Sequence, residues 1–369
     1  MKSKRIMIVD DSALVRNMLR ETIDANDGMQ VAYAAPHAQL ALTFLEKNEV
    51  DMVVLDVEMP IMDGIEATKR IRAKWPRLPI LMCSSLTKRG AAVTMRALAE
   101  GASDHIQKPD KSYPVDIFKK EILTKLRVLL GLPVEGMAPA PKPVNVAPAV
   151  PIRKAVQAKN RPPGKRGKIS ALAIGCSTGG PNALMELFKG LVRPLSLPLF
   201  IVQHMPPVFT NLLAERLAAQ SGQLVKEGEH DEPVRPGVCY VAPGGYHMVV
   251  AQEGTTIKIL LNEDPPENFC RPAVDVLFRS LAAVYGSEVL ASVLTGMGTD
   301  GSLGCVSLSD AGGRILIQDP ESCVVPSMPN GVLNAGVVES AMSLADIARE
   351  YERISALQGG RRRAVGGVL

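Results

Sequence analysis

The chain has 369 residues, a length that favours two or three domains over one. Apolar residues make up 46% and charged residues 22%, which is typical of a folded, water-soluble protein. The net charge of +4 is unevenly distributed: residues 132–168 and the three arginines of the C-terminal tail are strongly basic, and the rest of the chain is mildly acidic. Aromatic residues amount to only 4%. This composition argues against a basic nucleic-acid-binding core and against a base-stacking surface.

Cysteine usage and the lack of an apolar leader predict a cytoplasmic protein. No two of the six cysteines form a C-x-x-C pair, so neither a structural zinc site nor a redox dithiol is expected. Free thiols are typical of the cytosol. The N-terminus has a run of only four apolar residues before two acids, which is too short for a signal peptide. The longest charge-free stretch, 194–214, contains four prolines, so we expect no membrane insertion.

Residues 1–131 alternate short apolar runs with amphipathic segments. We predict strands at 5–9, 30–34, 52–55, 80–83 and 105–107, and helices at 13–24, 38–47, 64–74, 88–99 and after residue 114. Five strands alternating with five helices indicate a doubly wound parallel sheet that is covered on both faces. We therefore expect a first α/β domain over 1–131.

The alternating pattern stops at residue 132. Residues 132–168 contain eight prolines and eight basic residues, so they cannot form a core and are predicted to be an extended linker. The simplest interpretation is a solvated tether, with docking on an acidic partner as an open alternative.

The α/β alternation resumes over 169–357. We predict strands at 169–174, 197–203, 238–241, 247–251, 257–261, 289–295 and 314–317, and helices at 181–190, 208–220, 272–285, 301–311 and 343–357. This order predicts a second doubly wound parallel sheet. The tail, 358–369, is predicted to be disordered.

Acidic residues stand at the carboxyl ends of two predicted strands of the first domain. Asp10 and Asp11 follow the first strand and Asp56 follows the third. Functional groups of doubly wound sheets gather beyond the carboxyl ends of the strands, so three carboxylates converge if these two strands are neighbours. Three like charges need a cation among them, and an oxygen-only set favours Mg²⁺. The alternative is that each aspartate only caps the following helix, which suits any one of them better than the whole set.

Ser84 follows the fourth predicted strand and Lys108 the fifth, where a hydroxyl and an ammonium are suited to contact phosphoryl oxygens. Together with the acids, the segments IMIVDDSALVR, LDVEMPIMDG, MCSS and QKP resemble a response-regulator receiver domain, which has a flavodoxin-like fold. The resemblance implies phosphoryl transfer from a histidine kinase to Asp56. It further implies Ser84 as the switch residue, Lys108 as the phosphate contact, and a Mg²⁺ site made of Asp10, Asp11 and Asp56.

The second domain begins with a serine on a glycine-rich turn. Gly175, Ser177 and Gly179 fit G-x-S-x-G, a strand–turn–helix pattern that presents a nucleophilic serine. Pro181 suits the first turn of a helix whose free N–H groups would favour an oxyanion. The loop lacks the third glycine of a dinucleotide fingerprint and the Gly-Lys-Ser/Thr of a phosphate-binding loop. A tight turn without chemistry is the alternative.

A serine nucleophile needs a base and an orienting acid. His204 follows an apolar strand that ends at the same edge as Ser177, and Asp300 lies on a glycine-rich loop after a third such strand. Spacing favours His204 as the base but leaves His247 open. The order Ser–His–Asp differs from the Ser–Asp–His of ordinary α/β-hydrolases. We interpret Cys176 as a small buried residue rather than the nucleophile.

The segments GCSTGGP, IVQHMPPVFT, YVAPGGYHM, RPAVDVLF and LTGMGTDG resemble the catalytic domain of chemotaxis protein-glutamate methylesterases over about 169–350. The order receiver, linker, hydrolase is also that of this family. The resemblance implies a Rossmann-like serine hydrolase that needs no cofactor. It assigns the roles of nucleophile to Ser177, general base to His204, orienting acid to Asp300, and oxyanion or substrate contacts to Thr178 and Met297. Cys270 departs from the family pattern, in which we expect a histidine, and this bears on substrate-side or structural details rather than on the triad.

The resulting hypothesis is a phosphorylation-controlled serine esterase in chemotactic adaptation. It would demethylate glutamyl methyl esters on methyl-accepting chemoreceptors, deamidate receptor glutamines, and receive phosphate from a chemotaxis histidine kinase. A monomer is the default, and DNA is not an expected partner. A receiver joined to a DNA-binding output is disfavoured because the output is α/β and its folded part is not basic. A non-catalytic scaffold gated by the receiver is the third class.

Overall fold

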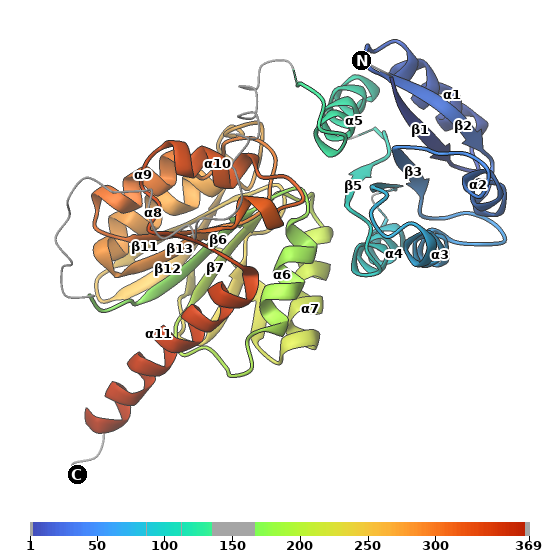
Figure 1. Ribbon diagram of the computed structural model, residues 1–369. Coiled ribbons are helices and arrows are strands. Elements are labelled where there is room, and N and C mark those ends of the chain that lie inside the picture. The colour runs from blue at the N-terminus through green and yellow to red at the C-terminus, as the bar shows by residue number, and fades with distance from the viewer. Residues whose placement is uncertain (1–2, 86, 112, 135–166, 366–369) are drawn as a thin grey trace, which may run out of the picture. The chain divides into compact units, whose positions relative to one another are not determined.

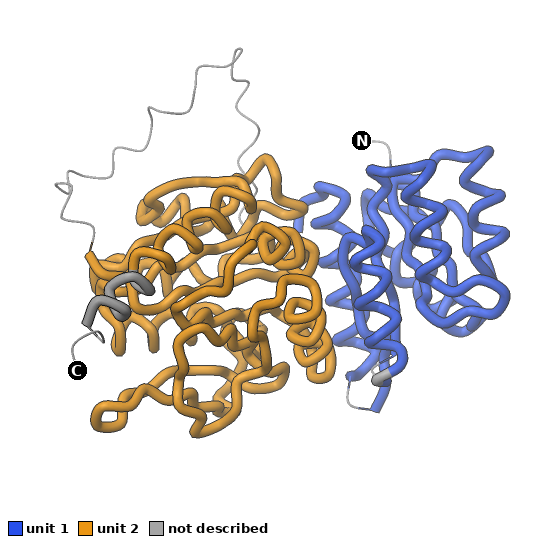
Figure 2. The backbone as a smooth tube through the Cα atoms, turned by 90° about the horizontal axis from the view of Figure 1, so that it is seen from below, with its two compact units in different colours: residues 1–137 blue, residues 138–369 orange. Residues whose placement is uncertain are grey.

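The computed structural model describes residues 3–85, 87–111, 113–134 and 167–365, and the chain divides into two compact units, Met1–Met137 and Ala138–Leu369 (Figure 2). The predicted linker, 132–168, lies almost entirely outside the described residues. Each unit is built around its own parallel sheet with helices on both faces (Figure 1), so the predicted α/β doubly wound architecture is confirmed. Within the described ranges, no helix is both long enough and apolar enough to cross a bilayer.

The first unit contains five parallel strands in the order β2-β1-β3-β4-β5. Its strands are β1 (Lys4–Val9), β2 (Met29–Ala35), β3 (Met52–Asp56), β4 (Ile80–Ser84) and β5 (Asp104–Gln107), and its helices are α1 (Ala13–Asp24), α2 (Ala38–Leu45), α3 (Gly64–Lys74), α4 (Lys88–Ala99) and α5 (Val115–Leu129). Helices α1 and α5 pack on one face of the sheet, and α2, α3 and α4 lie on the other (Figure 1). Every residue of β3 and β4 is buried, as expected for strands covered on both faces.

The main sheet of the second unit has seven parallel strands in the order β15-β14-β13-β6-β7-β10-β8. These are β6 (Ala171–Cys176), β7 (Leu199–Gln203), β8 (Leu224–Glu227), β10 (Val238–Val241), β13 (Val289–Val293), β14 (Arg314–Gln318) and β15 (Ser340–Met342). One face carries α6 (Gly180–Lys189), α7 (Phe209–Ser221) and α11 (Leu344–Val365), and the other carries α8 (Val274–Tyr285), α9 (Ser302–Asp310) and α10 (Ser327–Asn334) (Figure 1). Strand β6 lies between β7 and β13, so strand order reverses beside β6. Such a switch point brings the loops after these strands together at one edge.

A three-stranded antiparallel sheet that the sequence did not predict covers part of the second unit. It contains β9 (Glu232–Pro233), β11 (His247–Glu253) and β12 (Thr256–Asn262) in the order β11-β12-β9. We predicted β11 and β12 as strands but placed them in the parallel sheet. Only Gly254 and Thr255 separate their paired ends, and a two-residue turn can join only antiparallel neighbours. Met248, Val250 and Ile259 pack into the same core as α8.

The remaining differences from the sequence-based prediction concern short or terminal elements. Three strands, β8, β9 and β15, were missed because they have only two to four residues, and helix α10 was missed because it has only eight residues, with Pro329 in its first turn. Segments this short carry no clear periodicity. Short 3₁₀ turns, η1 (Gly286–Glu288) and η2 (Pro320–Ser322), precede β13 and follow β14. Helix α11 continues to Val365, whereas we predicted disorder from residue 358 onward.

Candidate functional site

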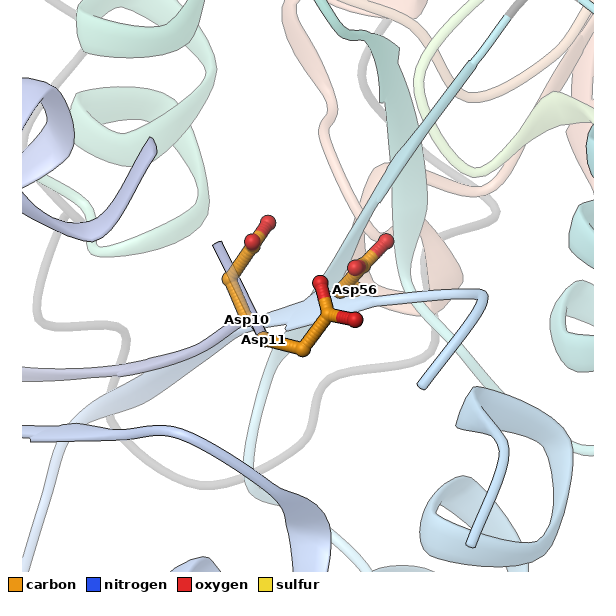
Figure 3. Close-up of side chains that lie close together, drawn as sticks. All are labelled: Asp10, Asp11 and Asp56. Atoms are coloured by element: carbon orange, nitrogen blue, oxygen red, sulfur yellow. The ribbon is translucent and has the colours of Figure 1, made fainter. Parts of the chain in front are cut away.

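Three carboxylates meet at the carboxyl edge of the first sheet (Figure 3). Strands β1 and β3 are parallel neighbours, as the convergence of these acids required. Asp10, Asp11 and Asp56 each place a carboxylate oxygen within 4.8 Å of the others. Asp10 and Asp56 are buried, whereas Asp11 is exposed, so the cluster is open to solvent on one side. This oxygen-only donor set with an open side fits a hydrated Mg²⁺ ion.

Lys108 reaches into the same cluster from the end of β5. Its Nζ lies 2.7 Å from Asp10 Oδ2 and 2.8 Å from Asp56 Oδ1. Its backbone N–H donates to the carbonyl of Ser84 at 2.7 Å, which holds the ends of β4 and β5 together. The Ser84 hydroxyl is buried and has no hydrogen-bond partner among the described residues. The predicted phosphate contact and switch residue therefore stand at the same edge as the carboxylates.

Burial and charge repulsion perturb the acids at this edge. Burial, followed by the negative charge of Asp10, raises the pKa of Asp56 to about 6, and Lys108 opposes this shift. Burial alone would lower the pKa of Lys108, but Asp56 and Asp10 outweigh burial and raise it. The site thus holds more negative charge than one lysine neutralises, which favours a bound cation.

In the second unit, Ser177 lies directly after β6 on a turn that depends on its glycines. Gly179 has a φ of 77°, in the left-handed region, and begins α6 as its N-cap. A Cβ built on Gly180 would lie 2.0 Å from Gln203 Oε1, and one built on Gly296 would lie 3.0 Å from the Cβ of Ser177. The loop after β13, which includes Gly296 and Met297, is therefore packed against the serine. Thr178 is buried, and its carbonyl accepts a hydrogen bond from Thr295 Oγ1 at 3.0 Å.

His204 and Asp300 are joined directly at the same edge. His204 Nε2 lies 2.7 Å from Asp300 Oδ2, and both side chains are largely buried. The alternative base, His247, uses both ring nitrogens elsewhere, since Nε2 donates to the Pro265 carbonyl and Nδ1 accepts from the Ala273 amide, each at 3.2 Å. Of these two histidines, His204 is therefore the one that is hydrogen-bonded to Asp300.

Asp300 also caps the N-terminus of α8. Its Oδ2 accepts from the Val274 amide at 2.6 Å, and its Oδ1 accepts from the Asp275 and Gly301 amides at 3.0 Å. Burial alone would raise the pKa of Asp300, but the hydrogen bond from His204 and these backbone amides lower it. The carboxylate is thus kept ionised and fixed in orientation.

Two cysteines, Cys176 and Cys270, lie near these residues in different surroundings. Cys176 is fully buried, and burial raises the pKa of its thiol, which supports its interpretation as a core residue. All six cysteines are free thiols, as predicted. Cys270 is half-buried and lies close enough to His204 to raise the pKa of that ring. The departure from the family pattern at position 270 therefore lies next to His204.

Two family models match the chain: "CheB methylesterase" over residues 172–351 and "Response regulator receiver domain" over residues 6–114. A protein-glutamate methylesterase/protein-glutamine glutaminase of Azospirillum brasilense is 40% identical, and the match covers 93% of this chain and 90% of that protein. This chain belongs to the protein-glutamate methylesterase family. A relative of the same name from Trichodesmium erythraeum is also 40% identical, over 95% of this chain and 98% of that one. The solved catalytic domain of the Thermotoga maritima CheB methylesterase is 36% identical, covers 50% of this chain and 98% of its own, and gives a TM-score of 0.49.

The sequence did not predict three residues that contact the predicted catalytic residues of this methylesterase: Gln203, Asn268 and Asp275. Gln203 donates through Nε2 to the carbonyls of Ser177 at 3.0 Å and His204 at 3.2 Å, and so ties the two loops together. Asn268 and Asp275 contact Oδ1 of Asp300, whereas His204 contacts Oδ2. The one available signal was Asp275, an acid in the otherwise apolar AVDVLF segment of the sequence.

The pH dependence of this methylesterase is expected to report the contact with Cys270. Burial alone would lower the pKa of His204, but Cys270 and then Asp300 outweigh burial and raise it. Replacing Cys270 by alanine removes one of these causes, so the pKa of His204 falls and its basic form is available at lower pH. The acid limb of kcat/KM for methyl-ester hydrolysis should therefore move to lower pH. The control is Cys323→Ala, which removes a thiol that donates a hydrogen bond to the Asp319 carbonyl and should leave the acid limb of kcat/KM in place. An acid limb that does not move in Cys270→Ala would contradict this prediction.

Proposed function

We propose that this methylesterase hydrolyses glutamyl γ-methyl esters of chemoreceptors with Ser177 as nucleophile, His204 as general base and Asp300 as orienting acid. The observation that carries the proposal is the 2.7 Å hydrogen bond between His204 and the buried carboxylate of Asp300, at the strand edge that presents Ser177. A base held in this way is what converts a serine hydroxyl into a nucleophile.

The reaction proceeds in two halves. Ser177 Oγ attacks the ester carbonyl while His204 takes the hydroxyl proton. Because Nε2 is bonded to Asp300, Nδ1 is the nitrogen left to move this proton. The C–O bond to the methoxy group then breaks, His204 returns the proton, and methanol leaves. Water, deprotonated by His204, attacks the glutamyl–Ser177 ester and releases the carboxylate. With a glutamine substrate the leaving group is ammonia, so the same steps deamidate the side chain.

The developing oxyanion rests on backbone donors near Thr178 and Met297. Thr178 lies between Ser177 and the first turn of α6, whose free N–H groups carry the positive end of the helix dipole. Met297 follows Gly296, which packs against the serine. Fixed donors of this kind stabilise the tetrahedral intermediate without having to reorganise during the reaction. No cofactor takes part in the ester hydrolysis.

The receiver unit supplies control through Asp56, the phosphoacceptor. Asp10, Asp11 and Asp56 are the residues that would hold Mg²⁺, which when bound neutralises charge on the phosphoryl oxygens. Lys108 contacts the phosphoryl group, and the unpartnered Ser84 hydroxyl turns toward it. Phosphorylation adds roughly two negative charges and shifts an existing conformational equilibrium toward the active esterase.

The partners that this chemistry requires are methyl-accepting chemoreceptors as substrate and a chemotaxis histidine kinase as phosphodonor. The enzyme acts in the cytoplasm as a monomer, and DNA is not a ligand. The receptor and kinase assignments are supported by the family to which the chain belongs and by the two kinds of site that its units carry, and the monomer is the default assumption.

The proposal is tested by methanol release from methyl-labelled chemoreceptor membranes, with and without acetyl phosphate and Mg²⁺. The wild type should release methanol, and the phosphodonor should raise the rate. Asp56→Asn should keep the basal rate but lose the whole response, because an amide cannot form the acyl phosphate. Asp63→Asn changes an exposed N-cap of α3 in the same unit and should respond as the wild type does.

Three outcomes separate the parts of this proposal. Release that ignores phosphodonor in the wild type would keep the esterase and remove its control by Asp56. A response that survives in Asp56→Asn would place the phosphoacceptor elsewhere. The absence of release from well-methylated receptors would contradict the esterase and favour the scaffold hypothesis.

A further inference from the structure

A tight turn places the side chain of Asn268 beside the buried carboxylates of Asp275 and Asp300. Glu267 and Cys270 exchange backbone hydrogen bonds of 3.1 and 2.9 Å, and the two residues between them, Asn268 and Phe269, have φ values of 53° and 63°. Both central residues are therefore in the left-handed region, as in a type I′ turn. Asparagine tolerates this conformation better than most side chains. The turn directs Cys270 to His204 and Asn268 to Asp300.

The amide of Asn268 bridges two buried carboxylates. Its Nδ2 donates to Asp300 Oδ1 at 3.0 Å and to Asp275 Oδ2 at 3.1 Å. Both partners are acceptors only, so the amide nitrogen must face them and the carbonyl oxygen must face away. Asp275 is itself anchored, because its Oδ1 accepts from the Gly304 amide at 2.6 Å. The two N–H groups of one side chain thus connect Asp300 to a fixed point on α8.

Without this bridge the two carboxylates would face one another in a buried site. Asp275 and Asp300 are 1% and 2% exposed. Burial and then Asp300 raise the pKa of Asp275 to about 6, while the Gly304 amide and Asn268 oppose the rise. Two negative charges that share one hydrogen-bond donor repel strongly in a poorly solvated site, and the donor between them offsets that repulsion. Asn268 therefore affects both where Asp300 points and how closely Asp275 approaches it.

We propose that Asn268 is a positioning residue of the esterase: by clamping Asp300 to Asp275 it holds the Asp300 carboxylate in line with the ring of His204. The inference rests on the proposed function, since it concerns how the triad is held. The hydrogen bonds of the Asn268 amide go to Asp275 and Asp300, so it acts on the reaction through Asp300. A small displacement of an orienting group lowers the rate without weakening substrate binding, so the effect belongs in kcat and not in KM.

Two substitutions separate the amide from the turn. Asn268→Gly removes the amide and retains a residue that adopts φ 53° without strain. Asn268→Asp retains the size and the turn preference but puts a third carboxylate where the donor stood. We expect kcat for methyl-ester hydrolysis to fall about tenfold in the first variant and about 100-fold in the second, the range typical of outer-shell partners of a reactive group, with KM unchanged. Asn334→Ala, at an exposed residue that ends α10, is the matched control and should behave as the wild type.

A fluorophosphonate probe tests the clamp independently of the receptor. The probe forms a P–O bond with the serine oxygen and releases fluoride, and its rate depends on how well the base is positioned. Full-length Asn268→Gly and Asn268→Asp should be labelled to the same final stoichiometry as the wild type but about tenfold and 100-fold more slowly. Wild-type rate constants in both variants would overturn the proposal. So would a lower stoichiometry with an unchanged rate constant, because that pattern means that Asn268 only supports folding. Wild-type protein that is labelled no faster than Ser177→Ala would instead count against the proposed function.

Discussion

Replacing Ser177 by alanine is expected to lower methyl-ester hydrolysis about 10⁶-fold, close to the loss seen when a serine-hydrolase nucleophile is removed. The reason is that the neighbouring cysteine cannot take over as the nucleophile. Cys176, the adjacent nucleophile by type, is fully buried, its Sγ–H donates to the Val202 carbonyl at 3.7 Å, and burial raises the pKa of its thiol. What remains in Ser177→Ala is the contribution of oxyanion donors and substrate binding, which still exceeds the reaction in water.

The measurement is single-turnover methanol release, with labelling by the fluorophosphonate probe as a second readout. Cys176→Ala is the matched control one residue away. It should retain the wild-type rate and probe stoichiometry and lose about 1–3 kcal/mol of unfolding free energy, because removing the sulfur leaves a small cavity in the sheet. If Cys176→Ala lost the activity and Ser177→Ala retained it, the nucleophile would be the cysteine and the mechanism proposed above would be wrong.

The sequence predicts the architecture of this protein well where its signals are local and repeated. Apolar runs at regular spacing located the five strands of the first sheet, and the strand ends located the carboxylates after β1 and β3. The same logic pointed to Ser177, His204 and Asp300, which follow β6, β7 and β13. Parallel strands carry this information because their carboxyl ends share one edge, so position along the chain translates into position in space.

What the sequence could not predict depends on contacts between distant segments. Nothing in the run from Glu267 to Cys270 indicates that its turn lies over Asp300, since it is separated from that residue by α8 and β13. The antiparallel sheet was missed for a different reason: the predicted strands stopped at residue 251 and resumed at 257, so the two-residue turn that specifies the pairing of β11 and β12 was not recognised. Roles that arise from the approach of two loops need the folded chain before they become visible.

Replacing Asp300 by asparagine is expected to lower kcat about 10⁴-fold, the loss that follows when an orienting carboxylate becomes an amide. In the wild type, Asp300 Oδ2 accepts from His204 Nε2 at 2.7 Å and from the Val274 amide at 2.6 Å. An amide nitrogen at this position would direct its hydrogens at the histidine and favour the tautomer that places the ring proton on Nδ1. The base would then already be protonated on the nitrogen that should receive the proton of Ser177.

The same substitution should shift the acid limb of the pH profile of kcat/KM as well as lower its plateau. Asp300 is one of the groups that raise the pKa of His204, so its loss lowers that pKa and moves the acid limb of kcat/KM to lower pH while the plateau falls. Because Asp300 also caps α8, Asp300→Asn should cost about 1–2 kcal/mol of unfolding free energy. Asp319→Asn makes the same carboxylate-to-amide change at a residue that caps η2 by accepting from the Glu321 amide, and it should keep the wild-type kcat. A fall in kcat proportional only to the fraction unfolded would show that Asp300 is a structural cap, whereas a 10⁴-fold loss in protein that remains folded requires that it orient the base.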